Sequence, residues 1–261
     1  MSVFRAGLFE GKVVLITGGG TGIGRALALA FGALGATVVV AARREAPLLA
    51  VVEAIEERGG RARMYTLDVR DEARVDEVVG LVWKESGAVD VLVNNAGGNF
   101  VSPAVAMNAR GFKAVLDINL VGTFLMSQAV GTRWLDEGKG GSIINLSATN
   151  AEGGSPLMAH SGASKAGINS LTQTLAVEWG GAGIRVNAVC PGPVRTEGSD
   201  ERLWTDEALV ERVEAGIPLG RFATPEDVVG VVMFLASEAG AFLTGSLIAL
   251  DGGERLRGLI F

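Results

Sequence analysis

Seven short apolar runs, separated by longer segments of helical character, constrain the fold of this chain more than any other feature. The runs are rich in valine, isoleucine and leucine, and each ends near glycine, proline, aspartate or asparagine. Continuously apolar strands are expected where helices cover both faces of a parallel sheet, and ligands of such sheets bind at the carboxyl ends of the strands. The runs are Val13–Thr17, Thr37–Ala41, Ala62–Leu67, Val89–Asn94, Ser142–Leu146, Ile184–Cys190 and Ser246–Leu250.

Length and composition indicate that these runs belong to one domain. The chain has 261 residues, of which 48% are hydrophobic, so it can bury a substantial core. No linker-like stretch divides it, and its glycines fall in turn-like clusters rather than at a fixed period. We therefore expect an α/β fold over residues 1–261, a single doubly wound parallel sheet of Rossmann-like type with helices on both faces.

The charges and the apolar segments exclude several classes of partner. The net charge is −6 and the charged runs mix both signs, so no basic surface for nucleic acid is expected. The longest apolar stretch, Ala26–Ala42, is shorter than the roughly 20 residues of a membrane span, and the N-terminus lacks the pattern of a signal peptide. A single cysteine, Cys190, cannot form an internal disulfide. These features predict a cytoplasmic protein with no membrane partner and a buried, inert thiol.

A glycine-rich segment follows the first predicted strand directly. Gly18, Gly22 and Gly24 have the spacing of a dinucleotide-binding loop that opens a helix. Without side chains there, the backbone can turn tightly and approach a pyrophosphate, whose charge is favoured at the N-terminus of a helix. A tight turn that binds nothing is the alternative interpretation.

The end of the second predicted strand indicates which dinucleotide is bound. An NAD-specific site usually places an acidic residue there for the ribose hydroxyls, but this chain has Ala42 followed by Arg43 and Arg44. Arginine binds a 2′-phosphate through paired, charge-assisted hydrogen bonds. NADP(H) is therefore the expected cofactor, unless the two arginines are solvated surface charges.

Several further motifs occur in the order found in one known family. They are Asn94–Gly98, Asn119, Ser161 with Lys165 four residues later, Pro191–Gly198 and Leu243–Gly253. Together with the glycine loop they resemble the short-chain dehydrogenase/reductase family over nearly the whole chain. The cofactor-binding residues that this resemblance implies are Gly18, Thr21, Gly22, Ile23, Gly24, Arg43, Arg44, Asp68, Val69, Asn95, Ala96, Gly97, Lys165, Pro191, Gly192, Val194 and Thr196.

The same resemblance implies a homotetramer, because the family is usually tetrameric. Two apolar segments late in the chain, Val231–Ala236 and Gly258–Phe261, fit this expectation because a monomer would expose them in part.

The chain departs from the family at two of its four usual catalytic positions. Ser161 stands where the family has tyrosine, and Ala148, thirteen residues earlier, stands where it has serine. Ketone reduction needs a group that protonates the alkoxide, and serine is a far weaker acid than tyrosine. Hydride addition to a double bond conjugated to a thioester needs instead neutral donors that stabilise an enolate oxygen. We therefore expect Asn119, Ser161 and Lys165 to be catalytic residues of such a conjugate reduction.

Two segments are similar to the enoyl-thioester reductase branch of this family, the trans-2-enoyl-CoA and 2,4-dienoyl-CoA reductases. They are Asn94–Met107 and Ala159–Gly167. The similarity implies an NADPH-dependent reductase with an acyl-CoA substrate. Met158–Gly167 looks closer to the trans-2-enoyl subgroup, which slightly favours reduction of a trans-2-enoyl-CoA to a saturated product. Some dienoyl-CoA reductases carry a catalytic tyrosine eleven residues before the serine, where this chain has Asn150.

Two other functions stay open at this point. One is a carbonyl reductase or alcohol dehydrogenase with a non-standard proton donor, and the other is a catalytically silent NADP-binding protein. The only histidine, His160, is expected to line the pocket or to deliver a proton. Its side chain should not bond that of Ser161, because successive helix residues point about 100° apart.

Overall fold

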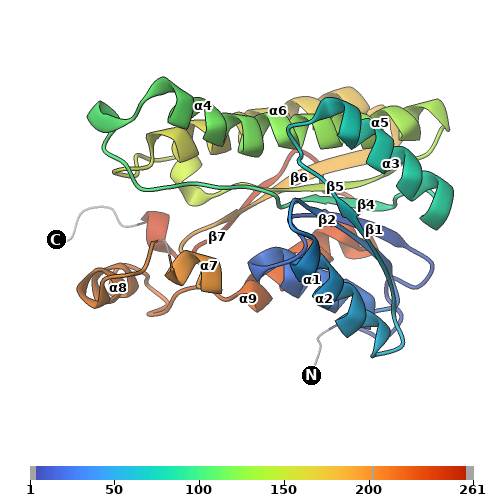
Figure 1. The fold of residues 1–261 in the computed structure, drawn as a ribbon, viewed down its shortest axis with the longest axis horizontal. Coiled ribbons are helices and arrows are strands. Elements are labelled where there is room, and N and C mark those ends of the chain that lie inside the picture. Colours follow the sequence, from blue (N-terminus) through green and yellow to red (C-terminus); the bar gives the residue numbers. More distant parts are fainter. Residues whose placement is uncertain (1–3, 202, 257–261) are drawn as a thin grey trace.

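A computed structural model of the chain contains one parallel sheet with helices packed on both of its faces (Figure 1). The structure describes residues 4–201 and 203–256. Within them, seven strands lie in the order β3-β2-β1-β4-β5-β6-β7. The strand order reverses between β1 and β4, and ligands of doubly wound sheets bind beside the carboxyl ends of the strands at such a reversal. The predicted Rossmann-like fold class is confirmed.

The strands begin and end within two residues of the predicted apolar runs. Their bounds are β1 (Val13–Thr17), β2 (Thr37–Ala42), β3 (Arg61–Thr66), β4 (Val91–Asn94), β5 (Gly141–Leu146), β6 (Ile184–Pro191) and β7 (Leu247–Leu250). The four central strands β1, β4, β5 and β6 are buried along nearly their whole length, whereas the edge strands β3 and β7 are partly exposed. The continuous apolar pattern is clearest where helices cover both faces of a strand.

The helices form one layer on each face of the sheet (Figure 1). One face is covered by α1 (Gly22–Ala33), α2 (Glu45–Glu56) and α9 (Pro225–Ala236), and the other by α3 (Glu72–Ser86), α5 (Gly122–Asp136) and α6 (Ala159–Trp179). The shorter helices are α4 (Ala109–Leu116), α7 (Glu197–Asp200) and α8 (Glu207–Glu214). Successive residues of β1 serve opposite layers, since Ile16 packs in the core that contains Phe31 and Leu15 in the core that contains Trp134.

The longest helical stretch runs from Ala109 to Asp136 and joins α4 to α5 through a π-helical turn, Asp117–Val121. Its length and composition would suffice to cross a membrane, but half of its most apolar window is buried inside this domain. It therefore serves as a core helix of the fold. The π-helical turn, a feature frequent at functional sites, carries Asn119.

A buried polar network that the sequence pattern did not indicate connects the strands β4 and β5 to the helices α5 and α6. Asn94 of β4 donates through Nδ2 to Ser127 Oγ and to Asn145 Oδ1, both at 2.9 Å. Asn145 of β5, fully buried, donates in turn to Thr172 Oγ1 of α6 at 2.9 Å. Buried polar groups are tolerated when they are bonded in this way, so the network fixes how α5 and α6 lie on the sheet.

Asn145→Ala is expected to lower the free energy of unfolding by about 2–4 kcal/mol, because it leaves a cavity and removes a partner from both Asn94 and Thr172. Urea unfolding followed by circular dichroism measures the change. A loss below about 0.5 kcal/mol, the range of an ordinary surface substitution, would contradict a structural role for the network.

Candidate active site

The glycine loop lies between β1 and α1 and has the geometry of a phosphate-binding turn. Gly18 and Gly22 adopt positive φ angles of 66° and 51°, which other residues rarely adopt. A side chain on Gly24 would place its Cβ 2.2 Å from the carbonyl oxygen of Gly18. Thr21, the N-cap residue of α1, makes no side-chain capping bond, so the first amides of this helix are not capped by a side chain. These features fit a pyrophosphate at the N-terminus of α1.

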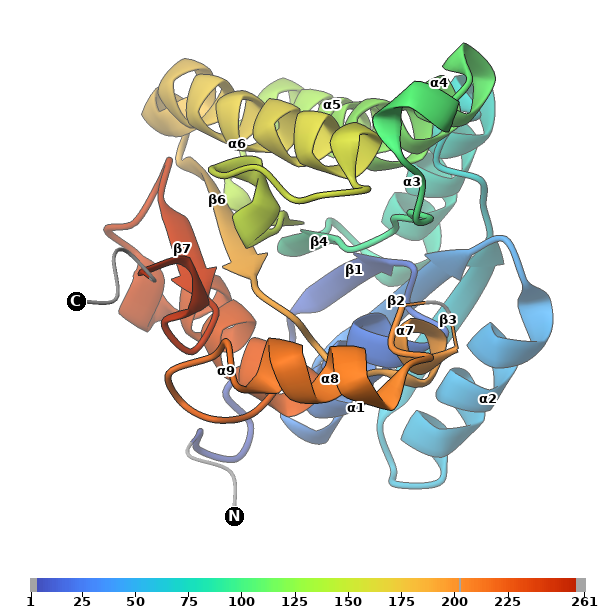
Figure 2. The ribbon, with the colours of Figure 1, turned by 90° about the vertical axis from the view of Figure 1, so that its left-hand side faces the viewer.

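A cleft of about 780 Å³ lies beside this loop at the carboxyl ends of β1, β2 and β4. It gathers nine of the predicted cofactor-binding residues, which are Gly18, Thr21, Gly22, Arg43, Arg44, Val69, Ala96, Gly97 and Thr196. It is also lined by residues that sequence reasoning missed, chiefly Pro47, Leu67, Ile118, Glu197, Gly198 and Glu201. Figure 2 shows the helices α7 and α8 at this end of the sheet, across from α4 and α6. The size and lining of the cleft suit a dinucleotide.

The remaining predicted cofactor residues lie outside the lining of this cleft. Asn95 supports the loop, since its Nδ2 donates to the carbonyl oxygens of Thr17 and Gly18 at 2.9 and 3.2 Å. Asp68 forms an ion pair with Arg70, and hydrogen bonds from that guanidinium lower the pKa of its carboxyl. The others outside the lining are Ile23, Gly24, Lys165, Pro191, Gly192 and Val194.

Ser161 and Lys165 lie on the first two turns of α6. The hydroxyl of Ser161, 3% exposed, accepts a hydrogen bond of 3.4 Å from Nδ2 of Asn150. Lys165 donates from Nζ to the carbonyl oxygen of Leu146 at 2.6 Å, and burial lowers the pKa of its ammonium to about 8. Within the described part of the chain, the Ser161 hydroxyl makes no hydrogen bond as a donor. Its proton is therefore available to an oxygen atom of a ligand.

Among the described residues, Asn119 is joined to Ser161 through Ser164 and not by a direct hydrogen bond. Its side chain is 2% exposed, with Oδ1 accepting from the amide of Gly98 and Nδ2 donating to Ser164 Oγ, both at 2.9 Å. Ser164 Oγ in turn donates to the carbonyl oxygen of Ser161 at 2.8 Å. Sequence reasoning missed Ser164, although its position three residues after Ser161 puts both on one face of α6. Ser164 thus connects Asn119 to the backbone of Ser161, and the catalytic role predicted for Asn119 stays a prediction.

His160 forms part of the wall of the site. It is fully buried, and its ring packs edge-to-face against Phe100 with a centroid distance of 4.3 Å. Its Nδ1 accepts from the backbone amide of Ser161 at 2.7 Å, so the two residues are joined through the backbone and not through their side chains. Burial lowers the pKa of His160, which favours the neutral ring that this bond requires. Burial also raises the pKa of the Cys190 thiol, as an inert cysteine requires.

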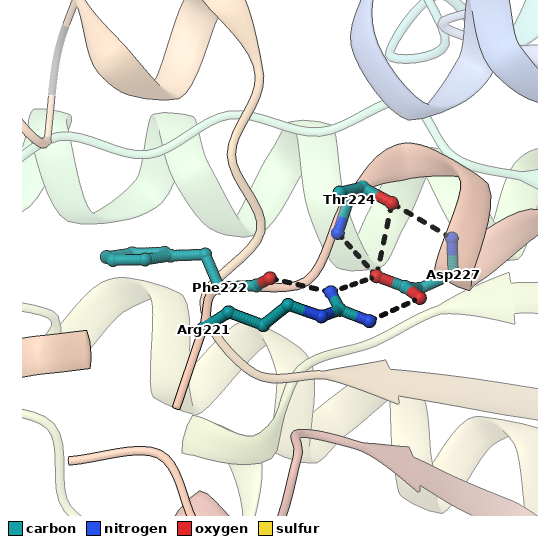
Figure 3. A network of polar contacts seen from close by, with 4 residues as sticks. All are labelled: Arg221, Phe222, Thr224 and Asp227. Carbon is teal, nitrogen blue, oxygen red and sulfur yellow. Dashed lines mark hydrogen bonds and ion pairs between the residues drawn. The ribbon is translucent and has the colours of Figure 1, made fainter. Parts of the chain in front are cut away.

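The Pro193–Arg195 segment is held by backbone bonds to a loop before α9. The amide of Ala223 donates to Pro193 O at 3.0 Å, and the amide of Arg195 donates to Ala223 O at 2.9 Å. Figure 3 shows what fixes that loop, an ion pair in which the Arg221 guanidinium contacts both carboxylate oxygens of Asp227 at 2.7 and 3.0 Å. This guanidinium holds the pKa of the Asp227 carboxyl well below its usual range.

Comparison with known proteins places this chain among reductases. Residues 18–254 match the model of a family described as enoyl-(acyl carrier protein) reductase. The chain is similar to a Bacillus subtilis protein named a probable 2,4-dienoyl-CoA reductase, (2E)-enoyl-CoA-producing, with 40% identity over 95% of this chain and 98% of that one. It is also similar to the 3-oxoacyl-[acyl-carrier-protein] reductase FabG of Thermotoga maritima, with 41% identity over 94% and 98% of the two chains.

Solved structures share the fold over the whole domain. One from Agrobacterium tumefaciens, with bound NADP, has a TM-score of 0.89 and 32% identity and covers 97% of this chain and 100% of its own. The names of the relatives therefore include both a double-bond reductase and a ketone reductase, and the family alone does not decide between these two reactions.

The depressed pKa of Lys165 predicts a measurable pH dependence of stability in the cofactor-free protein. The folded chain loses this proton near pH 8, below the ordinary 10.5, so the unfolded chain binds more protons between these values and stability rises with pH. Lys165→Met should be more stable than wild type at about pH 7, by up to about 3 kcal/mol, and this advantage should vanish by about pH 10.5. Chemical denaturation of both proteins across this range measures it; a difference that does not change with pH would contradict the shift.

Proposed function

The chain belongs to the short-chain dehydrogenase/reductase family, and we propose that it uses NADPH to reduce a carbon–carbon double bond conjugated to a CoA thioester. The observation that carries this proposal is the hydrogen bonding of the Ser161 hydroxyl. A serine stands where the family has its phenol, and its hydroxyl accepts from Asn150 while its own proton is free for a ligand oxygen. A neutral donor of this kind suits a developing enolate better than an alkoxide that must be protonated.

Each residue of the site then has a separate task. NADPH, when bound, would supply the hydride, and a proton taken from water at carbon would then convert the enolate to the reduced thioester. Ser161 donates its hydroxyl proton in a hydrogen bond to the thioester oxygen as that oxygen becomes negative, which lowers the energy of the transition state. Lys165 binds the nicotinamide ribose and adds positive charge beside the forming enolate. Asn119, through Ser164, holds the backbone of Ser161 in place.

The residues favour two neighbouring substrate classes, of which we propose 2,4-dienoyl-CoA thioesters first. The segment Met158–Gly167 is more similar to the trans-2-enoyl subgroup, whereas relatives aligned over nearly the whole chain are named 2,4-dienoyl-CoA reductases. Full-length alignment carries more weight than one segment of ten residues. Activity with a trans-2-enoyl-CoA alone would keep the reaction class and change the substrate.

A second candidate function is the reduction of a ketone, because the Thermotoga maritima relative is named a 3-oxoacyl reductase. The chain lacks the phenol expected for that reaction, and Ala148 removes the hydroxyl that usually accompanies it. Asn150 and Thr149 lie close to Ala148 in the chain but offer an amide and an alcohol, which are weak acids. A catalytically silent NADP-binding protein is disfavoured because the Asn119–Ser164–Ser161 bonds keep the site organised.

The cofactor prediction follows from Arg43 and Arg44, which line the proposed cofactor cleft. NADPH should exceed NADH in kcat/KM by at least about tenfold, since charge-assisted contacts to the 2′-phosphate contribute about 1.5–3 kcal/mol. Titration of both cofactors at fixed substrate measures the ratio. Arg43→Ala should reduce it, whereas Arg63→Ala, which removes an exposed arginine outside the cleft, should not. Equal efficiencies in the wild type would show that the arginines do not read the phosphate.

We propose a cytoplasmic homotetramer as the working form. Apolar side chains remain exposed on the isolated subunit, among them Phe234 at 38% and Phe242, which is fully exposed. Phe234 belongs to the segment Val231–Ala236 singled out from the sequence, and the other such segment, Gly258–Phe261, lies outside the described residues. Light scattering at micromolar concentration should give about four times the mass of one chain. A monomer would contradict this assembly.

Substitutions on α6 should separate the proposed tasks. Ser161→Ala should lower kcat by roughly 10- to 1,000-fold with little change in NADPH affinity, the effect of removing one oxyanion donor. Lys165→Ala should weaken NADPH binding and lower kcat together. Ser170→Ala, an exposed serine on the same helix, is the matched control and should change neither. Steady-state kinetics with direct NADPH titration distinguishes these results.

Replacing Ser161 by tyrosine, the residue usual in the family at this position, tests which class of reaction the site catalyses. Ser161→Tyr should not bring 3-ketoacyl-CoA reduction to a useful rate, because Ala148 still lacks the partner hydroxyl, and its ring should obstruct the thioester substrate. Asn150→Asp should lower kcat as Ser161→Ala does, because a carboxylate accepts the serine proton instead of leaving it for the substrate. Undiminished double-bond reduction in Ser161→Ala, with efficient ketone reduction by the wild type, would replace the proposal by the ketone-reductase alternative.

A further inference from the structure

Phe222 connects a well-fixed loop to the segment that borders the cofactor cleft. Its ring is 4% exposed, and Trp204 packs against it edge-on at a centroid distance of 5.1 Å. The guanidinium carbon of Arg195 lies 5.7 Å from the centre of the same ring. Two side chains from the segment after β6 therefore meet on one aromatic side chain.

That segment, which we call the cover segment, comprises Arg195–Glu201, Leu203 and Trp204. Thr196 and Ser199 form a capping box at the start of α7, with bonds of 2.8 and 3.1 Å between each side chain and the other's amide. The amides of Leu203 and Trp204 both donate to the carbonyl oxygen of Ser199, at 2.8 and 3.2 Å. These bonds make the cover segment one folded unit, and it contributes four residues to the lining of the cofactor cleft, namely Thr196, Glu197, Gly198 and Glu201.

On its backbone side, Phe222 is fixed by the ion pair at the start of α9. Arg221 donates from Nη1 both to the carbonyl oxygen of Phe222, at 2.9 Å, and to the carboxylate of Asp227 (Figure 3). Asp227 also accepts from the amide and hydroxyl of Thr224, which caps α9. The paired guanidinium and carboxylate thus hold the residue whose ring supports the cover segment.

The acidic side chains of the cover segment have the same sign of charge as the ligand that the cleft is proposed to bind. Glu197 and Glu201 both line the cleft and are acidic, whereas a dinucleotide carries negatively charged phosphates. Coulomb repulsion between like charges disfavours closure of this segment over the cofactor. Contacts that do not involve these carboxylates have to keep the segment in place, and the ring of Phe222 provides such contacts.

We propose that Phe222, held by the Arg221–Asp227 pair, is a positioning residue that anchors the cover segment over bound NADP(H). This inference rests on the proposed function because it assumes that the cleft binds this cofactor. Loss of one aromatic pair and one cation–π contact should accelerate cofactor release by about five- to tenfold or more. The rate of hydride transfer in a single turnover at saturating cofactor should change little, because the ring of Phe222 contacts Trp204 and Arg195 of the cover segment and not Ser161 or Lys165 among the described residues.

Phe222→Leu is the central variant, and Phe31→Leu is its matched control. Phe31 is also buried and also packs edge-to-face on another ring, Phe9, at 4.8 Å. It lies in α1 and belongs to the hydrophobic core on that face of the sheet. Stopped-flow fluorescence of NADPH release should show at least about fivefold faster release in Phe222→Leu than in Phe31→Leu. Equal rates of NADPH release from the two variants would contradict the anchoring role of Phe222.

Two further variants separate anchoring from general destabilisation. Trp204→Phe, which keeps a ring against Phe222, should retain slow release, whereas Trp204→Ala should release NADPH as fast as Phe222→Leu. Arg221→Gln should accelerate release, and Phe222→Leu added to it should have less than its separate effect, because both act through one contact. Fully additive effects, or no rescue by Trp204→Phe, would contradict the anchor. Failure of the wild type to bind NADPH at all would instead refute the proposed function.

Discussion

The junction between the carboxyl ends of β1 and β4 is the interaction on which the rest of the site depends. The hydroxyl of Thr17 accepts from the amides of Asn95 and Ala96, both at 3.0 Å, while the side-chain amide of Asn95 donates back to Thr17 and Gly18. This reciprocal bonding fixes the glycine loop relative to the strand that leads into Gly98. Because the amide of Gly98 donates to Asn119, the glycine loop and the residues that hold Ser161 are both attached to the end of β4.

The burial of the residues around Ser161 affects which reaction the site suits. Ser161 is almost completely enclosed, and burial lowers the pKa of both His160 and Lys165. In a site of low polarity, a correctly placed neutral donor stabilises developing charge more strongly than it would in water. These features suit the proposed reaction, in which charge spreads over a conjugated thioester. The site offers no phenol to protonate an isolated alkoxide.

The fold was predictable from the sequence wherever both faces of an element are covered. The central strands matched their apolar runs closely, and the edge strands β3 and β7 matched less clearly in burial because one side of each lacks a neighbouring strand. The glycine loop was predictable because positive φ angles at Gly18 and Gly22 leave few other residues possible. These predictions rest on local geometry, which a single sequence expresses directly.

The contacts within the site were less predictable, because they join residues that are distant in the chain. The sequence predicts a catalytic role for Asn119, which stays a prediction, but not the π-helical turn that directs its amide to Gly98 and Ser164. The sequence identifies Asn150 only as a position without tyrosine, because its bond to Ser161 depends on how the loop after β5 lies on α6. Their distances depend on how three separate elements pack, which no periodicity encodes.

The most direct test of the conjugate-reduction account follows the hydride itself. NADPH carrying deuterium at the transferred position can be supplied with a 2,4-dienoyl-CoA, a trans-2-enoyl-CoA or a 3-ketoacyl-CoA, and the products analysed by mass spectrometry and NMR. The account predicts deuterium on a carbon of the former double bond system, with little turnover of the ketone. Deuterium on the carbinol carbon of a rapidly formed 3-hydroxyacyl-CoA, with no reduction of either unsaturated thioester, would contradict it.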